Sequence, residues 1–209
     1  MSVPEIFDIT RENAPGHYKP SQTALLLLDY KALVIGRIGP KAEATVKEAV
    51  QMRNWARSKG IVVLHALVDF TGTPPFSTTK EFSRLSALSA QVQREGGGEE
   101  PRDLLEGDGD VEFNRRPGYI SALQSDGIKQ FLKDRGIKSL VLMGLSTGGC
   151  VLRTALDAAE NEFVVTIVRD GCADAKEEVH EFLFGKVFGR GDFVVSGREF
   201  REGYDRLKR

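Results

Sequence analysis

Short apolar runs alternate along this chain with stretches of helical spacing. Four runs are nearly continuous, as expected of strands buried on both faces of a parallel sheet: TALLLLD (23–29), IVVLHALV (61–68), SLVLMG (139–144) and FVVTIVRD (163–170). DFVVS (192–196) and the short VEF (111–113) complete a set of six predicted strands. Their lengths and their apolar character predict a central sheet.

Helical spacing fills most of the intervals between these runs. Apolar residues over 41–59 recur at amphipathic spacing, with Pro40 in the first turn and Gly60 after the last. Helices are also predicted over 124–134, 150–160 and 176–184, and a short polar helix at the end of the chain. This alternation predicts a single α/β domain over 1–209, with a doubly wound, mostly parallel six-stranded sheet in an α/β/α sandwich. In the order 3-2-1-4-5-6, strands one and four are neighbours.

The interval 69–110 breaks the alternation. It carries TGTPP, a serine-rich run and GGGEEP, without sustained periodicity. We expect a long loop insertion with short helical pieces. Loops of this length in a compact domain are usually lids or binding loops, so this one is expected to border the functional site.

Composition narrows the choice of ligand and compartment. Lys and Arg total 29 against 30 for Asp and Glu, a net charge of −1 with no basic tail, so a small molecule is expected rather than nucleic acid. The start lacks a signal-peptide core and no apolar run approaches the roughly 20 residues of a membrane span, which predicts a cytoplasmic protein without membrane contact. Two cysteines and three scattered histidines predict neither disulfides nor a metal site.

Two residues stand where parallel α/β sheets bind ligands. Asp29 closes the first predicted strand, and Cys150 follows Gly148 and Gly149 where the fourth strand gives way to a helix. The crevice of such sheets lies beyond the carboxyl ends of the strands, so the topology brings the two together. At a helix start, unpaired amides favour the thiolate and could hold an oxyanion.

Each of these features also has a structural interpretation. A lone cysteine in such a domain is more often a small buried side chain than a nucleophile, and Cys172 is interpreted in that way. An aspartate after a strand can simply cap a loop. GLSTGG (144–149) could be a phosphate loop, but it matches neither GxxxxGK[ST] nor GxGxxG.

The segment GLSTGGCVLRTALDA (144–158), together with TALLLLD before it and VVTIVRDGCAD after it, resembles the isochorismatase-like cysteine hydrolases from residue 23 to about 196. The resemblance implies a six-stranded parallel sheet between helices, Cys150 as nucleophile and Asp29 as its general base. It further implies a cis peptide between Leu145 and Ser146, and an oxyanion hole made by amides of Ser146 or its neighbours, among them Gly149, and of Cys150. Homo-oligomers, dimers or tetramers, are common in this family.

The chain departs from the family pattern at three places. The family's catalytic lysine is missing from NRRPGYISAL (114–123), where Arg115 or Arg116 could supply the charge or bind a substrate carboxylate, and Asn114 falls in the same gap. Lys31 stands where a glutamine is common, and either enters the crevice or lies on the surface. The long loop lacks the histidines of the nicotinamidase metal site, so that activity is disfavoured and no metal or cofactor is expected.

Because the branch that cleaves the vinyl ether of isochorismate typically lacks this cysteine, its presence favours hydrolysis of a C–N bond. The sequence therefore predicts a metal-independent amidohydrolase that cleaves a small amide, carbamoyl or imide compound through a thioester. An impaired small-molecule-binding or interaction protein on the same scaffold is the alternative, and a nucleotide- or flavin-binding domain ranks below both. Phe70, Phe76 and Phe82 of the long loop and Tyr119 are expected to frame the pocket or to pack in the core.

Overall fold

The fold is a six-stranded, wholly parallel sheet in a computed structural model that describes residues 3–74, 76–107 and 109–207. The strands are β1 (Thr23–Leu28), β2 (Val62–Val68), β3 (Val111–Arg115), β4 (Ser139–Leu145), β5 (Val164–Ala173) and β6 (Phe193–Val195). Their order is β3-β2-β1-β4-β5-β6, the order considered in the sequence analysis. β1 and β4 are therefore neighbours where the direction of winding reverses, with Leu28 paired to Gly144.

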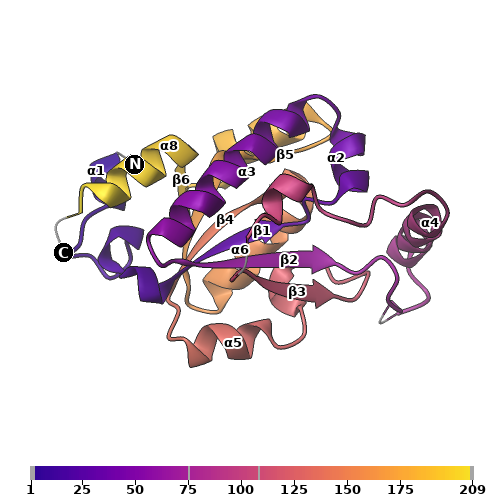
Figure 1. The fold of residues 1–209 in the computed structure, drawn as a ribbon, viewed down its shortest axis with the longest axis horizontal. Coiled ribbons are helices and arrows are strands. Elements are labelled where there is room, and N and C mark those ends of the chain that lie inside the picture. The colour runs from indigo at the N-terminus through magenta and orange to yellow at the C-terminus, as the bar shows by residue number, and fades with distance from the viewer. Residues whose placement is uncertain (1–2, 75, 108, 208–209) are drawn as a thin grey trace.

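Helices cover both faces of this sheet, which confirms the predicted fold class (Figure 1). They are α1 (Val3–Ile6), α2 (Ala32–Ile38), α3 (Lys41–Ser58), α4 (Lys80–Glu95), α5 (Ile128–Asp134), α6 (Leu152–Glu160), α7 (Glu177–Phe182) and α8 (Gly197–Asp205). Figure 1 shows α3 beside α8 across the front of the sheet. The crossovers through α5 and α6 run in the opposite direction, and right-handed connections then place these helices on the other face.

The interval 69–110 differs from its prediction. Instead of a loop with short helical pieces it contains α4, a 16-residue helix that stands at the right of Figure 1, away from the body of the sheet. The Thr79 hydroxyl accepts a hydrogen bond from the Phe82 amide (3.0 Å) at its start, and Gly96 ends it at φ 77°. Leu85 and Leu88 are buried. Serine and alanine dilute this narrow apolar stripe in the sequence, whereas Thr79 and Gly96 were readable helix signals.

Other element boundaries shift by a few residues. The helix predicted over 124–134 begins only at Ile128, after Gly127 in a left-handed conformation. The helix predicted from residue 150 begins at Leu152, because a turn of π-helix (Thr147–Val151) precedes it. α2 was not predicted. β3 runs two residues further than VEF and ends at Arg115, and this extension matters for the site.

A buried charge cluster fixes the segment that returns from α4 to β3. His65 on β2 is 3% exposed and contacts Glu100 through Nδ1 (2.8 Å) and Asp110 through Nε2 (3.2 Å). Arg53 of α3 donates to the same Asp110 carboxylate. Burial lowers the pKa of His65, but the two carboxylates outweigh it and the pKa is raised. The cluster therefore ties Glu100 and Asp110, in the segment between α4 and β3, to β2 and α3.

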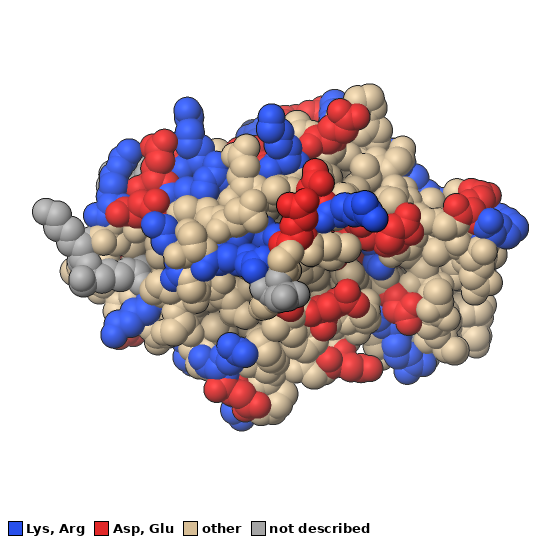
Figure 2. Space-filling view, in the orientation of Figure 1, with Lys and Arg blue, Asp and Glu red and all other residues tan. Residues whose placement is uncertain are grey.

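Charged side chains of both signs are interspersed over the face drawn in Figure 2. This distribution agrees with the nearly balanced composition. Among the helices that the structure describes, none is long and apolar enough to cross a membrane.

Candidate active site

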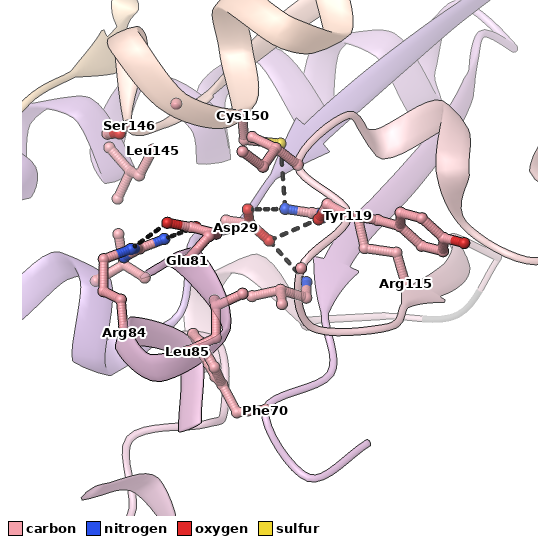
Figure 3. Close-up of a pocket in the computed structure, with 15 residues that line it drawn as sticks. Asp29, Phe70, Glu81, Arg84, Leu85, Arg115, Tyr119, Leu145, Ser146 and Cys150 are labelled. Atoms are coloured by element: carbon pink, nitrogen blue, oxygen red, sulfur yellow. Dashed lines mark hydrogen bonds and ion pairs between the residues drawn. The ribbon is translucent and has the colours of Figure 1, made fainter. Parts of the chain in front are cut away.

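A cavity of about 190 Å³ opens at the carboxyl edge of the sheet, where Asp29 follows β1 and Cys150 follows β4 (Figure 3). Apolar walls come from the strand ends, α2, α4 and the turn after β3. They are formed by Val34, Val68, Phe70, Leu85, Ile120 and Leu145. The polar floor is formed by Asp29, Arg115 and Cys150, which the fold brings together from three distant parts of the chain.

Asp29 is held rigidly although it follows the last residue of a strand. Its backbone has φ 54°, in the left-handed region that aspartate and asparagine tolerate better than most residues. Oδ1 accepts hydrogen bonds from the Val68 amide (2.8 Å) and from Nη1 of Arg115 (3.1 Å), and Nη2 of Arg115 donates to Oδ2. The carboxylate is thus buried in a bidentate pair with Arg115 on the floor of the cavity.

The sequence did not decide between Arg115 and Arg116 as the cation of the site, and the structure places Arg115 on the floor of the cavity. Its Nη2 donates to Sγ of Cys150 at 3.4 Å as well as to Asp29. Nε donates to the carbonyl of Tyr119 (3.0 Å), and Nη1 to the carbonyl of Ala66 (3.3 Å) and to Asp29. The five N–H groups of the guanidinium are therefore all engaged within the protein. Arg115 supplies fixed positive charge at the floor and has no donor left for a substrate carboxylate.

Arg116 and Asn114 face away from this site. Arg116 is exposed and donates through Nε to the carbonyl of Thr73 at 3.0 Å. Asn114, also exposed, donates to Glu112 at 2.6 Å. Alternation along β3 explains why Arg115, and neither of its neighbours Asn114 and Arg116, points into the site: consecutive side chains of a strand point to opposite faces. The predicted catalytic role of Arg116 is not supported by its position.

Cys150 is presented by a tight turn between β4 and α6. The peptide bond between Leu145 and Ser146 is cis, at the position that the sequence resemblance indicated. Gly149 interrupts the helical conformation with φ −102° and ψ −105°, and a Cβ at this position would lie 2.7 Å from Oγ of Ser146. The Gly149 amide donates to the Ser146 carbonyl at 3.1 Å, so it is not free to bind an oxyanion.

Two contacts that sequence reasoning missed hold the base of this turn. Oγ1 of Thr147 lies 2.9 Å from Nδ1 of the buried His180, and the Gly148 amide donates to Oδ2 of Asp174 at 2.8 Å. His180 belongs to α7 and Asp174 follows β5. Neither residue lines the cavity. They fix the nucleophile turn from behind, and only the packing of α7 against it identifies them.

Burial determines the protonation of the thiol. Cys150 is 4% exposed, and this burial, opposed by the charge of Arg115 but supported by that of Asp29, raises its pKa to about 12. Cys172, equally buried, has its pKa raised to about 12 as well. Burial therefore opposes the thiolate that the helix start was expected to favour. The charge of Arg115 lowers the pKa of the thiol but does not cancel the effect of its burial.

Iodoacetamide should therefore label both cysteines slowly at pH 7, with midpoints well above the ordinary value of about 8.5, because thiolate is the reacting form. Peptide mass spectrometry between pH 6 and 10 measures each site separately. In the unfolded protein both should label as ordinary thiols, which provides the control. A midpoint below 8.5 at Cys150 alone would contradict the protonation state derived from burial.

The remaining predicted residues divide between the cavity and its surroundings. Phe70 lines the cavity and is 5% exposed. Tyr119 also lines it, and its ring points away from Asp29 and Cys150 in Figure 3. Lys31 does not line it. Its ammonium group donates to the carbonyl of Gly98, so Lys31 ties down the segment after α4 instead of replacing the family lysine.

Glu81 and Arg84, at the start of α4, line the cavity but were not predicted. Two hydrogen bonds join their side chains, one of them from Nε to Oε2 at 2.9 Å. A prediction of α4 as a helix would have placed Glu81 and Arg84 together, because residues three apart lie on one face of a helix. The buried Leu85 and Leu88 lie near that face. In the part of the chain that the structure describes, no group of three or more His, Cys, Asp or Glu side chains is arranged to hold a metal ion.

The site lies within a recognisable domain. Residues 23–199 match the family model of the isochorismatase domain, which covers most of the chain. The chain belongs to the isochorismatase-like hydrolase family. The match includes Asp29, Arg115 and Cys150, so the floor of the cavity lies inside the family domain.

Relatives of this family member include amidohydrolases. It is 25% identical to the maleamate amidohydrolase of Pseudomonas putida over 190 residues, 82% of each chain. A nicotinamidase of Escherichia coli is 29% identical over 84 residues, 38% of this chain and 39% of the nicotinamidase. The solved structure of a cysteine hydrolase from Pseudomonas syringae superposes with a TM-score of 0.72 at 15% identity, covering 90% of this chain and 94% of the other, and shows the shared fold.

Proposed function

We propose that this isochorismatase-family protein hydrolyses a C–N bond of a small amide, carbamoyl or imide substrate, with Cys150 as nucleophile. The observation that supports this most directly is the contact of the Cys150 thiol with the Asp29–Arg115 pair on the floor of an open cavity. A nucleophile, a base and a fixed cation are then within reach of one bound carbonyl. The amidohydrolases among its relatives point to the same bond type.

Asp29 is the general base in this proposal. Burial raises the pKa of the Cys150 thiol, so the thiol loses its proton to Asp29 as its sulfur attacks the carbonyl carbon. The tetrahedral intermediate then expels the amine, which takes the proton back from Asp29 as it leaves. Water hydrolyses the remaining thioester, with Asp29 again as base, and the thiol is restored.

Arg115 acts by charge alone. An arginine is effectively never deprotonated, and the pKa of Arg115 is raised further by Asp29 and Cys150 despite its burial. It therefore stabilises the thiolate as it forms but cannot carry a proton, and all proton transfer falls to Asp29. We assign the oxyanion to the amides of Cys150 and Ser146, since the Gly149 amide is engaged by the Ser146 carbonyl.

A small-molecule-binding protein without turnover is the second candidate. Two observations favour it: burial raises the pKa of the Cys150 thiol, and Arg115 occupies both carboxylate oxygens of Asp29 with hydrogen bonds. The cavity would then bind its ligand without chemistry. Catalysis and binding differ in one observable, a covalent bond at Cys150.

Acyl trapping distinguishes the two. The protein is mixed with a panel of small amides, ureas and imides, and with an activated ester such as p-nitrophenyl acetate, then quenched in acid within seconds. Hydrolysis predicts a mass increase equal to the acyl group on the peptide that contains Cys150 and none on the peptide that contains Cys172. Saturable binding without any acylated Cys150 would establish the non-catalytic alternative.

We further propose that hydrolysis requires no metal, because Asp29, Arg115 and Cys150 supply base, charge and nucleophile themselves. Treatment with EDTA followed by gel filtration should leave kcat/KM unchanged within about twofold. Restoration of activity by an added divalent ion after such treatment would contradict this part of the proposal.

A further inference from the structure

The turn that presents Cys150 packs directly on α7. The side chain of Thr147 in this turn is fully buried, and its Oγ1 lies 2.9 Å from Nδ1 of His180. A Cβ at Gly148 would lie 2.9 Å from Cγ1 of Val179, so no space separates the turn from the helix. A change at the contact between Thr147 and His180 therefore reaches the amides that we assign to the oxyanion.

His180 also borders a second cavity, of about 470 Å³. In the described structure this cavity shares no lining residue with the one that contains Cys150. Its walls come from α3, β5, α7, β6 and the start of α8, and they include Thr45, Arg169, Cys172, His180, Val195 and Ser196. Nδ1 of His180 contacts Thr147, whereas Nε2 makes no hydrogen bond to any residue that the structure describes. The imidazole thus connects the nucleophile turn with a separate space.

The direction of the hydrogen bond between Thr147 and His180 depends on the protonation of the imidazole. The Thr147 hydroxyl has no other hydrogen-bond partner among the described residues, so it donates to Nδ1 of a neutral imidazole, whose proton is then on Nε2. A protonated imidazole donates through both nitrogens. The hydroxyl must then accept, and its own proton is left without an acceptor in a fully buried place. The contact is therefore complete only while His180 is neutral.

Charged groups surround His180 on several elements. Burial lowers its pKa, and so does the charge of Arg169. Glu177, Glu181 and Asp174 raise the pKa without cancelling these effects, and the lowered pKa favours the neutral imidazole. The other charged groups of the packed elements are Asp170 of β5, Glu199 of α8 and, paired with Glu177, Lys41 of α3.

We propose that His180 is a positioning residue, which holds the nucleophile turn through Thr147 in the conformation that aims the oxyanion amides at the substrate, and that protonation of the imidazole breaks this contact. This inference rests on the proposed function. His180 does not line the cavity that contains Cys150, so it acts on the transition state through the oxyanion and not on substrate binding. Loss of the contact should therefore lower kcat and leave KM unchanged within about twofold.

Four substitutions separate the hydrogen bond from the helix that carries it. Thr147→Val and His180→Ala remove one partner each and should lower kcat at least about tenfold, less than the roughly 10²- to 10³-fold cost of deleting an oxyanion donor. Their effects should not add in the double variant. His180→Asn, whose amide oxygen can replace Nδ1 as acceptor, should keep most of the activity. Phe182→Asn, at a position of α7 that is 61% exposed, is the matched control and should change nothing.

The pH profile gives a readout that a merely structural role would not change. As the pH falls through the pKa of His180, below the ordinary value of about 6.5, kcat of the unaltered protein should fall, because protonation reverses the hydrogen bond. NMR of the imidazole protons measures this pKa directly. His180→Asn has no group that titrates there and should lose this decline. A decline that persists in His180→Asn with the same midpoint would overturn the inference.

The second cavity allows chemical rescue. Alanine at position 180 opens the place of the imidazole to this cavity, so added imidazole should enter and again accept the Thr147 proton. Imidazole should raise kcat of His180→Ala in a saturable manner, and it should have no effect on the double variant with Thr147→Val. Absence of rescue, or equal rescue of both variants, would contradict the proposed contact.

Backbone NMR separates the inference from failure of the proposed function. The amide signals of Ser146 and Cys150 should shift with the same pH midpoint as the imidazole of His180, and Thr147→Val should abolish this shared midpoint. If they do so but no ligand acylates Cys150, the action of His180 on the turn stands and the hydrolytic proposal fails. If a substrate is hydrolysed but the amides do not follow His180, or if His180→Ala raises KM alone, the hydrolytic proposal stands and the positioning role fails.

Discussion

Replacing Cys150 with alanine lowers kcat on an identified substrate by at least about 10⁴-fold, because no other side chain on the floor of the cavity can form the thioester. The fold should tolerate the change. Alanine removes one sulfur atom from a site that already borders a cavity, so we expect a change of less than about 1.5 kcal/mol in the free energy of unfolding. Steady-state kinetics and urea unfolding measure the two effects.

Cys172→Ala is the matched control for this experiment. Both thiols are 4% exposed, and burial raises the pKa of both to about 12, but Cys172 does not line the cavity. The control should keep its activity within about twofold. Substantial turnover by Cys150→Ala, or equal losses in the two variants, would show that the loss does not arise from nucleophilic attack by Cys150.

Replacing Arg115 with alanine should damage both stability and catalysis. The side chains of Arg115 and Asp29 are 3% and 7% exposed, so the substitution leaves a buried carboxylate without its partner. Breaking a buried pair in this way costs about 3 to 5 kcal/mol, which corresponds to a fall in Tm of roughly 6 to 20 °C for a domain of this size. The thiolate also loses its nearest cation, and kcat/KM should fall at least about 100-fold.

Arg115→Lys separates charge from geometry. Lysine, the residue that the family resemblance implies here, keeps the charge beside Asp29 and Cys150 but has fewer donors for the carbonyls of Tyr119 and Ala66. We expect it to recover most of the activity that alanine loses and only part of the stability. Arg116→Ala, on the exposed face of the same segment, should behave like the unaltered protein. If Arg115→Ala retained full activity, the pair would be purely structural.

The sheet and two of the three floor residues could be predicted from the sequence. All six residues of β1 are buried, so a continuous apolar run identified it, and the order of strand and helix signals was enough to place Asp29 and Cys150 at one edge. Helix α4 escaped prediction because it packs only a narrow stripe against Val68 and Phe70. Because α4 was not predicted, its cavity-lining residues Glu81 and Arg84 were not predicted either.

Local pattern thus determined the strands and the turn that carries the nucleophile, because burial on both faces and the freedom of glycine can be recognised from neighbouring residues. Only the tertiary structure decided which arginine faces Asp29, that Lys31 binds the carbonyl of Gly98, and that burial raises the pKa of the Cys150 thiol. The first depends on the direction in which Arg115 points from the edge strand β3, and the last on the exclusion of water from Cys150 by segments that are distant in the chain. Both arise only when residues far apart in the chain are packed together.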